Sequence, residues 1–356
     1  MRIGIMAPPW LPVPPPMYGG TESVVDRLAR GFQQCGHDVL LWTTGDSTCP
    51  VPKGYILERA DPHRMGHTVL ELQHLIHGYK AMIEWEADIV HDHTLIGPLY
   101  TQLSSPFPVV TTNHGPFGHE LIDLYRCIGD NIPIIAISAD QARRALDVPI
   151  AAIIHHGIDL DAFPVGYGDG DDAGHYFLYL GRMAPEKGAR QAAEAARRAG
   201  KRLILAAKMR EPAEREFFAS QVAPLLSERI TYIGEVDGPT RLSLLQGATG
   251  LVNPIRWPEP FGLVMIEALA CGTPVLTFAE GSAPELIDHG RTGFVCHDVA
   301  EMAIKMQHVH QLDRTACRRE AVNRFSTERM AADHLRLFED IIAGERGGVR
   351  GGLLAL

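Results

Sequence analysis

Two basic side chains lie in a glycine-bounded segment near the middle of the chain, Gly181-Arg182-Met183-Ala184-Pro185-Glu186-Lys187-Gly188. The segment follows an apolar run and precedes a helical pattern. Arg182 and Lys187 therefore converge beside the backbone N–H groups of a helix start, and this combination suits a phosphate or diphosphate. A glycine turn with two surface charges is the alternative. The GxxxxGK[ST] spacing of a P-loop is absent.

A second segment, residues 253–274, contains a buried helix with an unusual charge. Prolines stiffen the loop before the helix, which is predicted to begin around Phe261 or Gly262 and to end at Cys271-Gly272. The helix is apolar almost throughout, so it should be buried, and Glu267 in its middle requires a partner. An ion pair with an arginine is one explanation for this residue.

The carboxylates of the same segment could also bind a ligand. Glu259 precedes the helix start, whereas Glu267 lies roughly 7 Å along the helix axis from Gly262. These carboxylates could hold hydroxyl groups at two ends of one ligand. The amides of Phe261, Gly262 and Leu263 would then face an anion that lies between them.

Polar residues also follow predicted strands in the first half of the chain. Gly19-Gly20-Thr21 precedes the first helix, where paired glycines let backbone amides approach an anion or a sugar hydroxyl. His91-Asp92-His93-Thr94 and Thr111-Thr112-Asn113-His114-Gly115 each follow a strand. The HxH spacing is typical of a zinc ligand pair, but further ligands at a recognisable interval are missing, so we predict no metal site. No GxGxxG follows the first strand, which disfavours an NAD-linked dehydrogenase.

Apolar strands alternate with helical patterns along the whole chain. Continuous apolar strands separated by helices indicate parallel sheets covered on both faces. The predicted strands are 2–7, 39–42, 88–90, 108–110, 134–137, 176–180, 203–207, 230–233, 250–252 and 274–276, and the principal predicted helices are 21–35, 190–199 and 327–343.

The alternation stops at residues 166–174, which are rich in Gly and Asp and are predicted to be a domain linker. We therefore expect an α/β protein of two Rossmann-like, doubly wound parallel-sheet domains that face each other across a cleft. Ligands of such sheets bind outside the carboxyl ends of the strands, so the cleft should hold the site. The expected parts are a first domain at 1–165, a second at 175–326, a helix at 327–343 that packs back toward the first domain, and a tail at 344–356.

Composition excludes several classes of protein. The 356 residues are 46% hydrophobic and 21% charged, as in a folded protein of two domains. The formal charge of −10 argues against sequence-independent binding to nucleic acid or anionic lipid. No apolar window of about 18 residues predicts a transmembrane helix. Six scattered cysteines without a CxxC pair predict reduced thiols in a cytoplasmic protein.

The GRxxxEKG segment and the EPFGLVxIEAxACGTPV segment together resemble the retaining nucleotide-sugar glycosyltransferases of family 4, which have the GT-B fold. The second motif is long and specific. The resemblance continues through Pro284-Glu285-Leu286-Ile287 and Gly290-Arg291-Thr292-Gly293-Phe294, and in a looser form it covers nearly all of residues 1–343.

This resemblance implies a role for each matching residue of the second domain. Arg182 and Lys187 match the pair that binds the donor diphosphate. Glu259 matches the acidic residue over the donor sugar, and the amides of Phe261-Gly262-Leu263 would lie near the sugar and the β-phosphate. Glu267 matches the carboxylate that holds the ribose hydroxyls.

One departure is that Ala207-Lys208-Met209 stands where the family has a glycine-rich turn, although Lys208 could supply another phosphate contact. In the first domain the resemblance implies that Gly19 and Gly20 line the cleft near the donor phosphate and that His114 contacts the sugar near the reaction centre. On the acceptor side it places Tyr18, Thr21, His91, His93, Ser138 and Arg143.

We therefore expect a hexosyltransferase that moves a hexose from a nucleotide diphosphate sugar to an acceptor hydroxyl, with retention, by a front-face route, without a metal or other cofactor. The predicted catalytic residues are His114, Arg182, Lys187 and Glu259. The alternatives are a sugar-nucleotide epimerase or phosphorylase of the same fold, or a non-catalytic sugar-nucleotide-binding protein. A peripheral role at a lipid acceptor is a further alternative, although no basic amphipathic patch favours it. The sequence indicates no oligomeric state.

Overall fold

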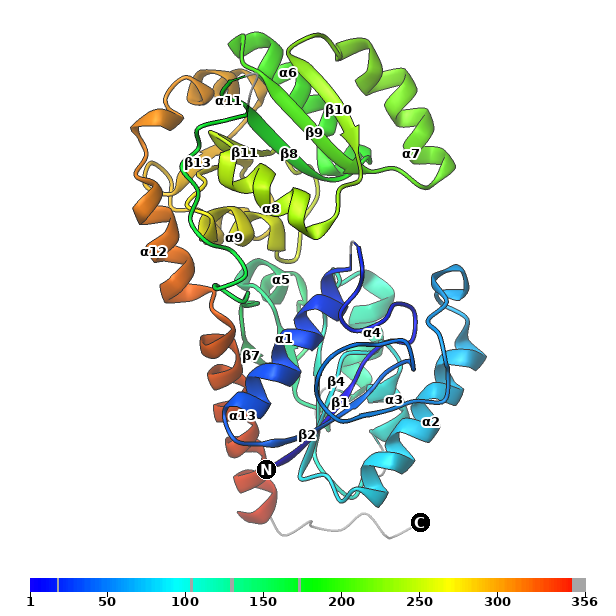
Figure 1. Cartoon of the computed structure of the whole chain (residues 1–356). Coiled ribbons are helices and arrows are strands. Elements are labelled where there is room, and N and C mark those ends of the chain that lie inside the picture. Colours follow the sequence, from blue (N-terminus) through cyan, green and yellow to red (C-terminus); the bar gives the residue numbers. More distant parts are fainter. Residues whose placement is uncertain (18, 103–104, 129–130, 172–173, 348–356) are drawn as a thin grey trace. The chain divides into compact units, whose positions relative to one another are not determined.

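The computed structural model describes residues 1–17, 19–102, 105–128, 131–171 and 174–347 (Figure 1). The chain divides into two compact units. Unit 1 comprises residues 1–157 together with the chain from Thr327 onward, and unit 2 comprises Ile158–Ser326. Each unit is built on a parallel sheet of its own.

Unit 1 holds a seven-stranded sheet in the order β3-β2-β1-β4-β5-β6-β7, with every paired neighbour parallel. The strands are β1 (Arg2–Met6), β2 (Asp38–Trp42), β3 (Lys53–Gly54), β4 (Ile89–Asp92), β5 (Val109–Thr112), β6 (Ile134–Ala136) and β7 (Ile150–Ile153). The helices are α1 (Gly20–Gln34), α2 (Thr68–Glu84), α3 (Gly97–Thr101), α4 (His119–Ile128), α5 (Ala139–Arg144) and α13 (Thr327–Gly347).

The core of unit 1 forms where helices cover the apolar strands. Trp42 at the end of β2 packs with Leu75 and Tyr79 of α2 in one buried cluster. Around α1, Phe32 contacts Phe338 of α13 with ring centroids 5.5 Å apart. Figure 1 shows α13 lying alongside α1. The last helix therefore completes unit 1, although the whole of unit 2 precedes it in the sequence.

Unit 2 holds a six-stranded parallel sheet in the order β10-β9-β8-β11-β12-β13. The strands are β8 (Phe177–Arg182), β9 (Leu203–Lys208), β10 (Ile230–Gly234), β11 (Gly250–Asn253), β12 (Val275–Phe278) and β13 (Gly293–Cys296). The helices are α6 (Ala189–Ala199), α7 (Pro212–Phe217), α8 (Gly238–Gly247), α9 (Leu263–Ala270), α10 (Ala283–Leu286), α11 (Val299–Met306) and α12 (Arg314–Arg324).

Small side chains let α6 lie close to this sheet. Its buried face consists of alanines, which share a core cluster with Phe177 of β8 and Leu203 of β9. The helix ends at Gly200, whose φ of +64° is a left-handed conformation that favours glycine. Because β8 leads directly into α6, this packing fixes where the β8–α6 loop leaves the sheet.

The predicted fold class is confirmed, since each unit is a doubly wound parallel sheet of the Rossmann-like type. The predicted strands are present with small shifts at their ends. The sequence patterns did not predict β3, which has only two residues, β7, where half-buried and exposed positions alternate, or β13, which has four residues. β3 is too short to show an apolar run, whereas β7 (IAAI) and β13 (GFVC) do contain short apolar runs that were not predicted as strands; all three lie at sheet edges.

The structure draws the division of the chain earlier than the predicted end of the first domain at residue 165. The segment predicted to be a linker, 166–174, is bonded to unit 2: the N–H groups of Gly166, Gly168 and Gly170 donate to carbonyl oxygens of that unit at 3.0 Å. The last helix, predicted at 327–343, extends to Gly347, so the first residues of the predicted tail are helical. Residues 348–356 lie outside the described residues.

Arg314 at the start of α12 helps to hold residues 166–174 against unit 2. Its guanidinium donates to the carbonyl oxygens of Gly166 and Ala248, both at 3.0 Å, and to the hydroxyl of Thr273 at 2.8 Å. One side chain therefore satisfies acceptors from three separate loops.

We predict that Arg314→Ala lowers the free energy of unfolding by about 3 kcal/mol, because it leaves several acceptors without a donor. Urea unfolding followed by circular dichroism measures the change. Arg197→Ala, at an exposed position of α6, is the matched control. Equal midpoints for the two variants would show that Arg314 does not hold the segment.

Candidate active site

The two motif segments of unit 2 meet at one edge of its sheet. β8 and β11 are parallel neighbours, so the loops that follow them leave from the same side. Gly188 has a φ of +81°, and a Cβ atom there would lie 2.0 Å from the carbonyl oxygen of Pro254. The N–H of Arg256 donates to the carbonyl oxygen of Glu186 at 2.8 Å. The loop after β8 and the loop after β11 are therefore packed directly against each other.

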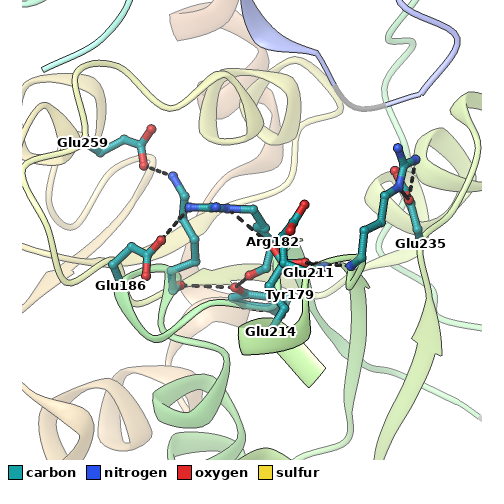
Figure 2. Close-up of polar contacts among 9 residues, drawn as sticks. Tyr179, Arg182, Glu186, Glu211, Glu214, Glu235 and Glu259 are labelled. Carbon is teal, nitrogen blue, oxygen red and sulfur yellow. Dashed lines mark hydrogen bonds and ion pairs between the residues drawn. The ribbon is translucent and has the colours of Figure 1, made fainter. Parts of the chain in front are cut away.

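This packing brings Lys187 to Glu259. The Lys187 ammonium forms an ion pair with Oε2 of Glu259, the contact drawn in Figure 2. Nε1 of Trp257 donates to the same oxygen at 2.7 Å. The ammonium also lies 4.8 Å from the centre of the Trp257 ring, a cation–π distance. Lys187 and Glu259 are only 14% and 18% exposed, so the pair is stronger than a surface ion pair.

Arg182 lies beside this pair and has acidic neighbours of its own. Its guanidinium donates to Oε1 of Glu186 at 2.5 Å, and its Nε lies 3.9 Å from Oε1 of the buried Glu214. The Tyr179 hydroxyl donates to the carbonyl oxygens of Arg182 at 3.0 Å and of Lys187 at 3.3 Å (Figure 2). The tyrosine thus fixes the backbone that carries both cations.

A third loop holds the backbone of Glu259. Gly281 has a φ of +56°, and a Cβ atom there would lie 2.4 Å from the nitrogen of Glu259. The N–H of Ser282 donates to the carbonyl oxygen of Glu259 at 3.0 Å, and its hydroxyl donates to the carbonyl oxygen of Phe261. The segment before α9 is therefore fixed from both sides.

The helix α9 begins after Gly262, whose φ is +93°. Glu267 in this helix is 4% exposed, as its apolar surroundings predict, and its Oε2 lies 3.4 Å from NH1 of Arg241 in α8. The arginine partner that the sequence left open is thus present. The ion pair does not prevent a second contact to a ligand, and both explanations for Glu267 stand.

Lys208 ends β9 beside Arg182, its register partner at the end of β8. The departure from a glycine-rich turn therefore adds a third cation to the same edge of the sheet. This edge can exchange its ion pairs: an incoming anion with two or more charges competes with Glu186 and Glu259 for the cations. Carboxylates released in this way become acceptors for hydroxyl groups.

In unit 1, the proline-rich loop before α1 is anchored at Val13. Its N–H donates to the Ser47 hydroxyl at 2.9 Å, and its carbonyl oxygen accepts from the N–H groups of Thr48 and Cys49 at 2.9 Å. The loop leads to Gly19, where a Cβ atom would lie 2.8 Å from Pro15. Glycine is thus required at the first helix start. Gly20 and Thr21 are half-buried beside it, and Tyr18 lies outside the described residues.

Glu22 is a buried carboxyl in the first turn of α1, and sequence reasoning missed it. It is 6% exposed, and its Oε2 lies against Gly19. Burial raises the pKa of Glu22 to about 7, although the backbone N–H of the residue opposes this. The side chain therefore titrates near neutral pH at the glycine pair predicted to approach an anion.

Two predicted histidines meet at the ends of β4 and β5. Nδ1 of His93 lies 2.8 Å from Nε2 of His114. The His114 ring also stacks on that of His156, with centroids 5.2 Å apart and planes 22° apart. Burial lowers the pKa of His114 to about 3 and that of His93 well below its usual value. Both imidazoles are therefore neutral at physiological pH.

Asp92 between the two histidines of the HDH motif has a structural role. Its Oδ1 accepts from the N–H and from the hydroxyl of Thr94, both at 2.7 Å, and the Tyr79 hydroxyl donates to its Oδ2. A Cβ atom at Gly97 would lie 1.8 Å from Oδ2, so a glycine is needed there. This network fixes the loop that presents His93.

His91 differs from its predicted position in the wall of a cleft. Its ring is 0% exposed, with Nε2 2.8 Å from the Thr112 hydroxyl and with His334 of α13 at a centroid distance of 5.0 Å. Side chains two residues apart along a strand lie on the same face, and the His91 and His93 rings accordingly lie together, with centroids 4.0 Å apart. His91 therefore packs behind His93 in the interior of unit 1.

The remaining acceptor-side residues lie at α5. Ser138 is fully buried and caps the helix, because its hydroxyl accepts from the N–H of Gln141 at 3.0 Å. The Gln141 amide donates to the carbonyl oxygens of Asn113 at 2.9 Å and of Gly115 at 2.7 Å, which ties α5 to the loop carrying His114. Arg143 is largely exposed and pairs with Asp140. Of these two predicted residues, only Arg143 has a side chain at the surface.

Among the described residues, no three His, Cys, Asp or Glu side chains are grouped in a way that could hold a metal ion. Over the same part of the chain, no helix combines the length and the apolar character needed to span a bilayer.

Two family models match the chain. One, described as "Glycosyltransferase Family 4", matches residues 18–162, and the other, "Glycosyl transferases group 1", matches residues 174–311. A glycogen synthase of Mycobacterium tuberculosis is 27% identical over 373 residues, which cover 90% of this chain and 88% of the relative. A D-inositol 3-phosphate glycosyltransferase of Mycobacterium avium is 27% identical over 250 residues, which cover 64% of this chain and 56% of the relative.

Solved structures share the fold. Sucrose-phosphate synthase from Thermosynechococcus elongatus matches with a TM-score of 0.75 at 20% identity and covers 96% of this chain and 99% of its own. HepE from Anabaena in complex with UDP and glucose matches with a TM-score of 0.72 at 19% identity and covers 95% of this chain and 99% of its own. The two sheets thus have the arrangement of elements found in GT-B glycosyltransferases.

The raised pKa of Glu22 predicts a pH-dependent stability. The folded state binds a proton that the unfolded chain releases near pH 4.5, so this residue costs stability as pH rises from 4.5 through about 7. Glu22→Gln removes that cost. We expect the variant to gain about 2 kcal/mol relative to wild type between about pH 5.5 and about pH 7.5.

Urea unfolding of both proteins across this pH range measures the difference. Glu120→Gln, at an exposed carboxyl of α4, is the control. A difference between Glu22→Gln and wild type that is independent of pH would contradict the buried, proton-binding state of Glu22.

Proposed function

The chain belongs to glycosyltransferase family 4, and we propose that it transfers a hexose from a nucleotide diphosphate sugar to an acceptor hydroxyl, with retention of configuration at the anomeric carbon. The observation that carries this proposal is the group of Arg182, Lys187 and Glu259 at one edge of the unit 2 sheet. Two cations and one carboxylate match the two parts of such a donor, an anionic diphosphate and a polyhydroxylated sugar.

The donor diphosphate takes the place of the carboxylates that now neutralise the cations. Its oxygens bind Lys187 and Arg182, together with the amides of Gly262 and Leu263 at the α9 start. Glu259, released from Lys187, accepts hydrogen bonds from hydroxyl groups of the hexose. HepE, which has the same fold, has been crystallised in complex with UDP-glucose, and this supports a nucleotide sugar as the donor.

The chemical step breaks the bond between the anomeric carbon and the diphosphate oxygen. The electron pair goes to the leaving diphosphate, where the two cations and the helix amides stabilise the charge in place of a metal. The acceptor oxygen forms the new bond on the same face, and its proton passes to the departing phosphate. Glu259 lies just before α9 and Glu267 lies within it. They are therefore poorly placed to flank the anomeric carbon as the paired carboxylates of retaining hydrolases do.

The other predicted residues complete the proposal. Glu267 binds the ribose hydroxyls of the donor. Gly19 and Gly20 offer amides to the donor phosphate, His114 contacts the transferred hexose, and Thr21 and Arg143 border the acceptor. We place the reaction in the cytoplasm, in line with the unpaired cysteines of the described residues.

Binding followed by turnover tests the function. A thermal-shift series with UDP, GDP and ADP and their hexose derivatives should identify one donor that raises the melting temperature. Incubation of that donor with a panel of sugar and polyol acceptors should then yield a product with the anomeric configuration of the donor, read by proton NMR. Inversion would exclude the front-face route. Binding without turnover on any acceptor would favour a non-catalytic protein, and donor conversion without an acceptor would favour an epimerase.

Lys187→Ala should lower kcat for transfer by about 100- to 1,000-fold, because the leaving diphosphate loses its most buried cation. Initial rates at saturating donor measure the effect, and circular dichroism checks the fold. Arg198→Ala, at an exposed position of α6, is the charge-matched control. Wild-type kcat in Lys187→Ala would remove this residue from the site.

Glu267→Gln should raise the donor KM about tenfold with little change in kcat, as expected for a contact made equally in the ground and transition states. Arg241→Ala breaks the observed ion pair but keeps the carboxylate, and it should leave the donor KM near the wild-type value. If Glu267→Gln alters only the unfolding midpoint, the role of Glu267 is to pair with Arg241.

A further inference from the structure

We propose that His93 is a positioning residue that fixes His114 in the tautomer with its proton on Nδ1. This inference rests on the proposed function, in which His114 contacts the transferred hexose. It goes beyond that function because it states which atom of His114 carries the proton, and therefore which kind of hydrogen bond His114 can make.

The two rings share one hydrogen bond. Nδ1 of His93 and Nε2 of His114 are 2.8 Å apart, with ring centroids 5.1 Å apart and planes at 34°. A neutral imidazole has one N–H and one lone pair, so one of these nitrogens donates and the other accepts. The direction of this bond decides the tautomer of both residues.

The surroundings of His93 set the direction. Its second nitrogen, Nε2, is buried and has no hydrogen-bond partner in the described part of the chain. If Nδ1 of His93 accepted, the proton of the ring would lie on Nε2 as a buried donor without an acceptor. If Nδ1 donates, Nε2 is a bare lone pair. Buried N–H groups without acceptors are the rarer and more costly of the two cases. His93 therefore donates, and His114 accepts at Nε2.

The neighbouring His334 shows the same arrangement in a case that chemistry determines. Its Nδ1 lies 2.8 Å from the carbonyl oxygen of Met330, which can only accept, so Nδ1 carries the proton. Its Nε2 is buried without a partner in the described residues, as a lone pair. His91, which lies between His334 and His93, likewise has one partnered nitrogen and one buried nitrogen with no partner among the residues that the structure describes.

These histidines are uncharged, so each ring carries only one N–H. Burial lowers the pKa of His91 and His93 well below the usual value and that of His334 to about 4, and the close rings oppose one another's protonation. Each ring thus has one protonated nitrogen and one nitrogen with a lone pair. The stacking of His114 on His156 fixes the plane of the His114 ring as well.

A definite chemical role for His114 follows. Its Nε2 lone pair is occupied by His93, and its one N–H is at Nδ1. His114 can donate a hydrogen bond to an oxygen atom of the bound sugar, but it has no lone pair with which to remove a proton from the acceptor. His114 therefore orients the sugar and does not act as a general base.

Nitrogen-15 NMR of the folded protein reads the tautomer directly. In protein labelled at its histidines, long-range nitrogen–proton correlations at pH 7.5 distinguish protonated from bare ring nitrogens, and His114→Gln assigns the His114 signals. We expect Nδ1 of His114 to be protonated and Nε2 to be bare. The reverse pattern, or a signal averaged over both tautomers, would overturn the proposal.

Two substitutions at His93 add a functional measurement. In His93→Asn the side-chain amide can still donate to His114, and we expect the wild-type tautomer and kcat within threefold of wild type. In His93→Phe the ring shape remains but the donor is lost, and we expect an averaged tautomer and a 10- to 100-fold lower kcat with an unchanged donor KM. Circular dichroism checks that both variants fold, and the wild-type spectrum decides the proposal if one does not.

The NMR spectrum tests the tautomer of His114, and the transfer assay independently tests the proposed function. The proposed tautomer in a protein that transfers no sugar would refute the proposed function and leave the His93–His114 assignment standing. Active transfer with the reverse tautomer would refute the assignment and leave the function standing.

Discussion

The ion pair between Lys187 and Glu259 is the interaction on which the candidate active site depends. It exists because two loops approach closely at one edge of a parallel sheet, and the approach requires a glycine: any side chain at Gly188 would meet the carbonyl oxygen of Pro254. A half-buried ammonium without a counter-charge would be costly, and Glu259 supplies that charge while no donor is bound. The same two groups match the diphosphate and the sugar of the proposed donor. The pair therefore neutralises the buried charges when no donor is bound and supplies the proposed donor contacts when one is.

In unit 1, the histidine proposed to contact the sugar is neutral. The histidines at the ends of β4 and β5 are buried and uncharged, and each is held by a hydrogen bond to a neighbouring side chain. A neutral donor suits contact with sugar hydroxyls, whereas fixed cations suit a leaving diphosphate. In the proposed reaction, unit 2 thus supplies the charged groups and unit 1 supplies neutral hydrogen-bond donors.

The alternation of apolar strands and helices predicted both sheets except for the edge strands β3, β7 and β13, because fully buried parallel strands leave a strong local signal. The motif around Glu259 and Glu267 also placed a helix start and a buried acid correctly. The pairing of Lys187 with Glu259 could not be predicted, since it depends on two loops that are distant in the sequence. His334 was missed for a related reason: α13 returns to unit 1 only after all of unit 2, and no spacing in the sequence links it to His91.

The binding of a diphosphate by Lys187 and Arg182 is best tested with a crystal structure of the protein bound to a nucleoside diphosphate. Phosphate oxygens should lie within hydrogen-bonding distance of the Lys187 ammonium and the Arg182 guanidinium, and the carboxylate of Glu259 should have moved away from Lys187. An intact pair between Lys187 and Glu259, with the diphosphate bound at another part of the protein, would contradict it.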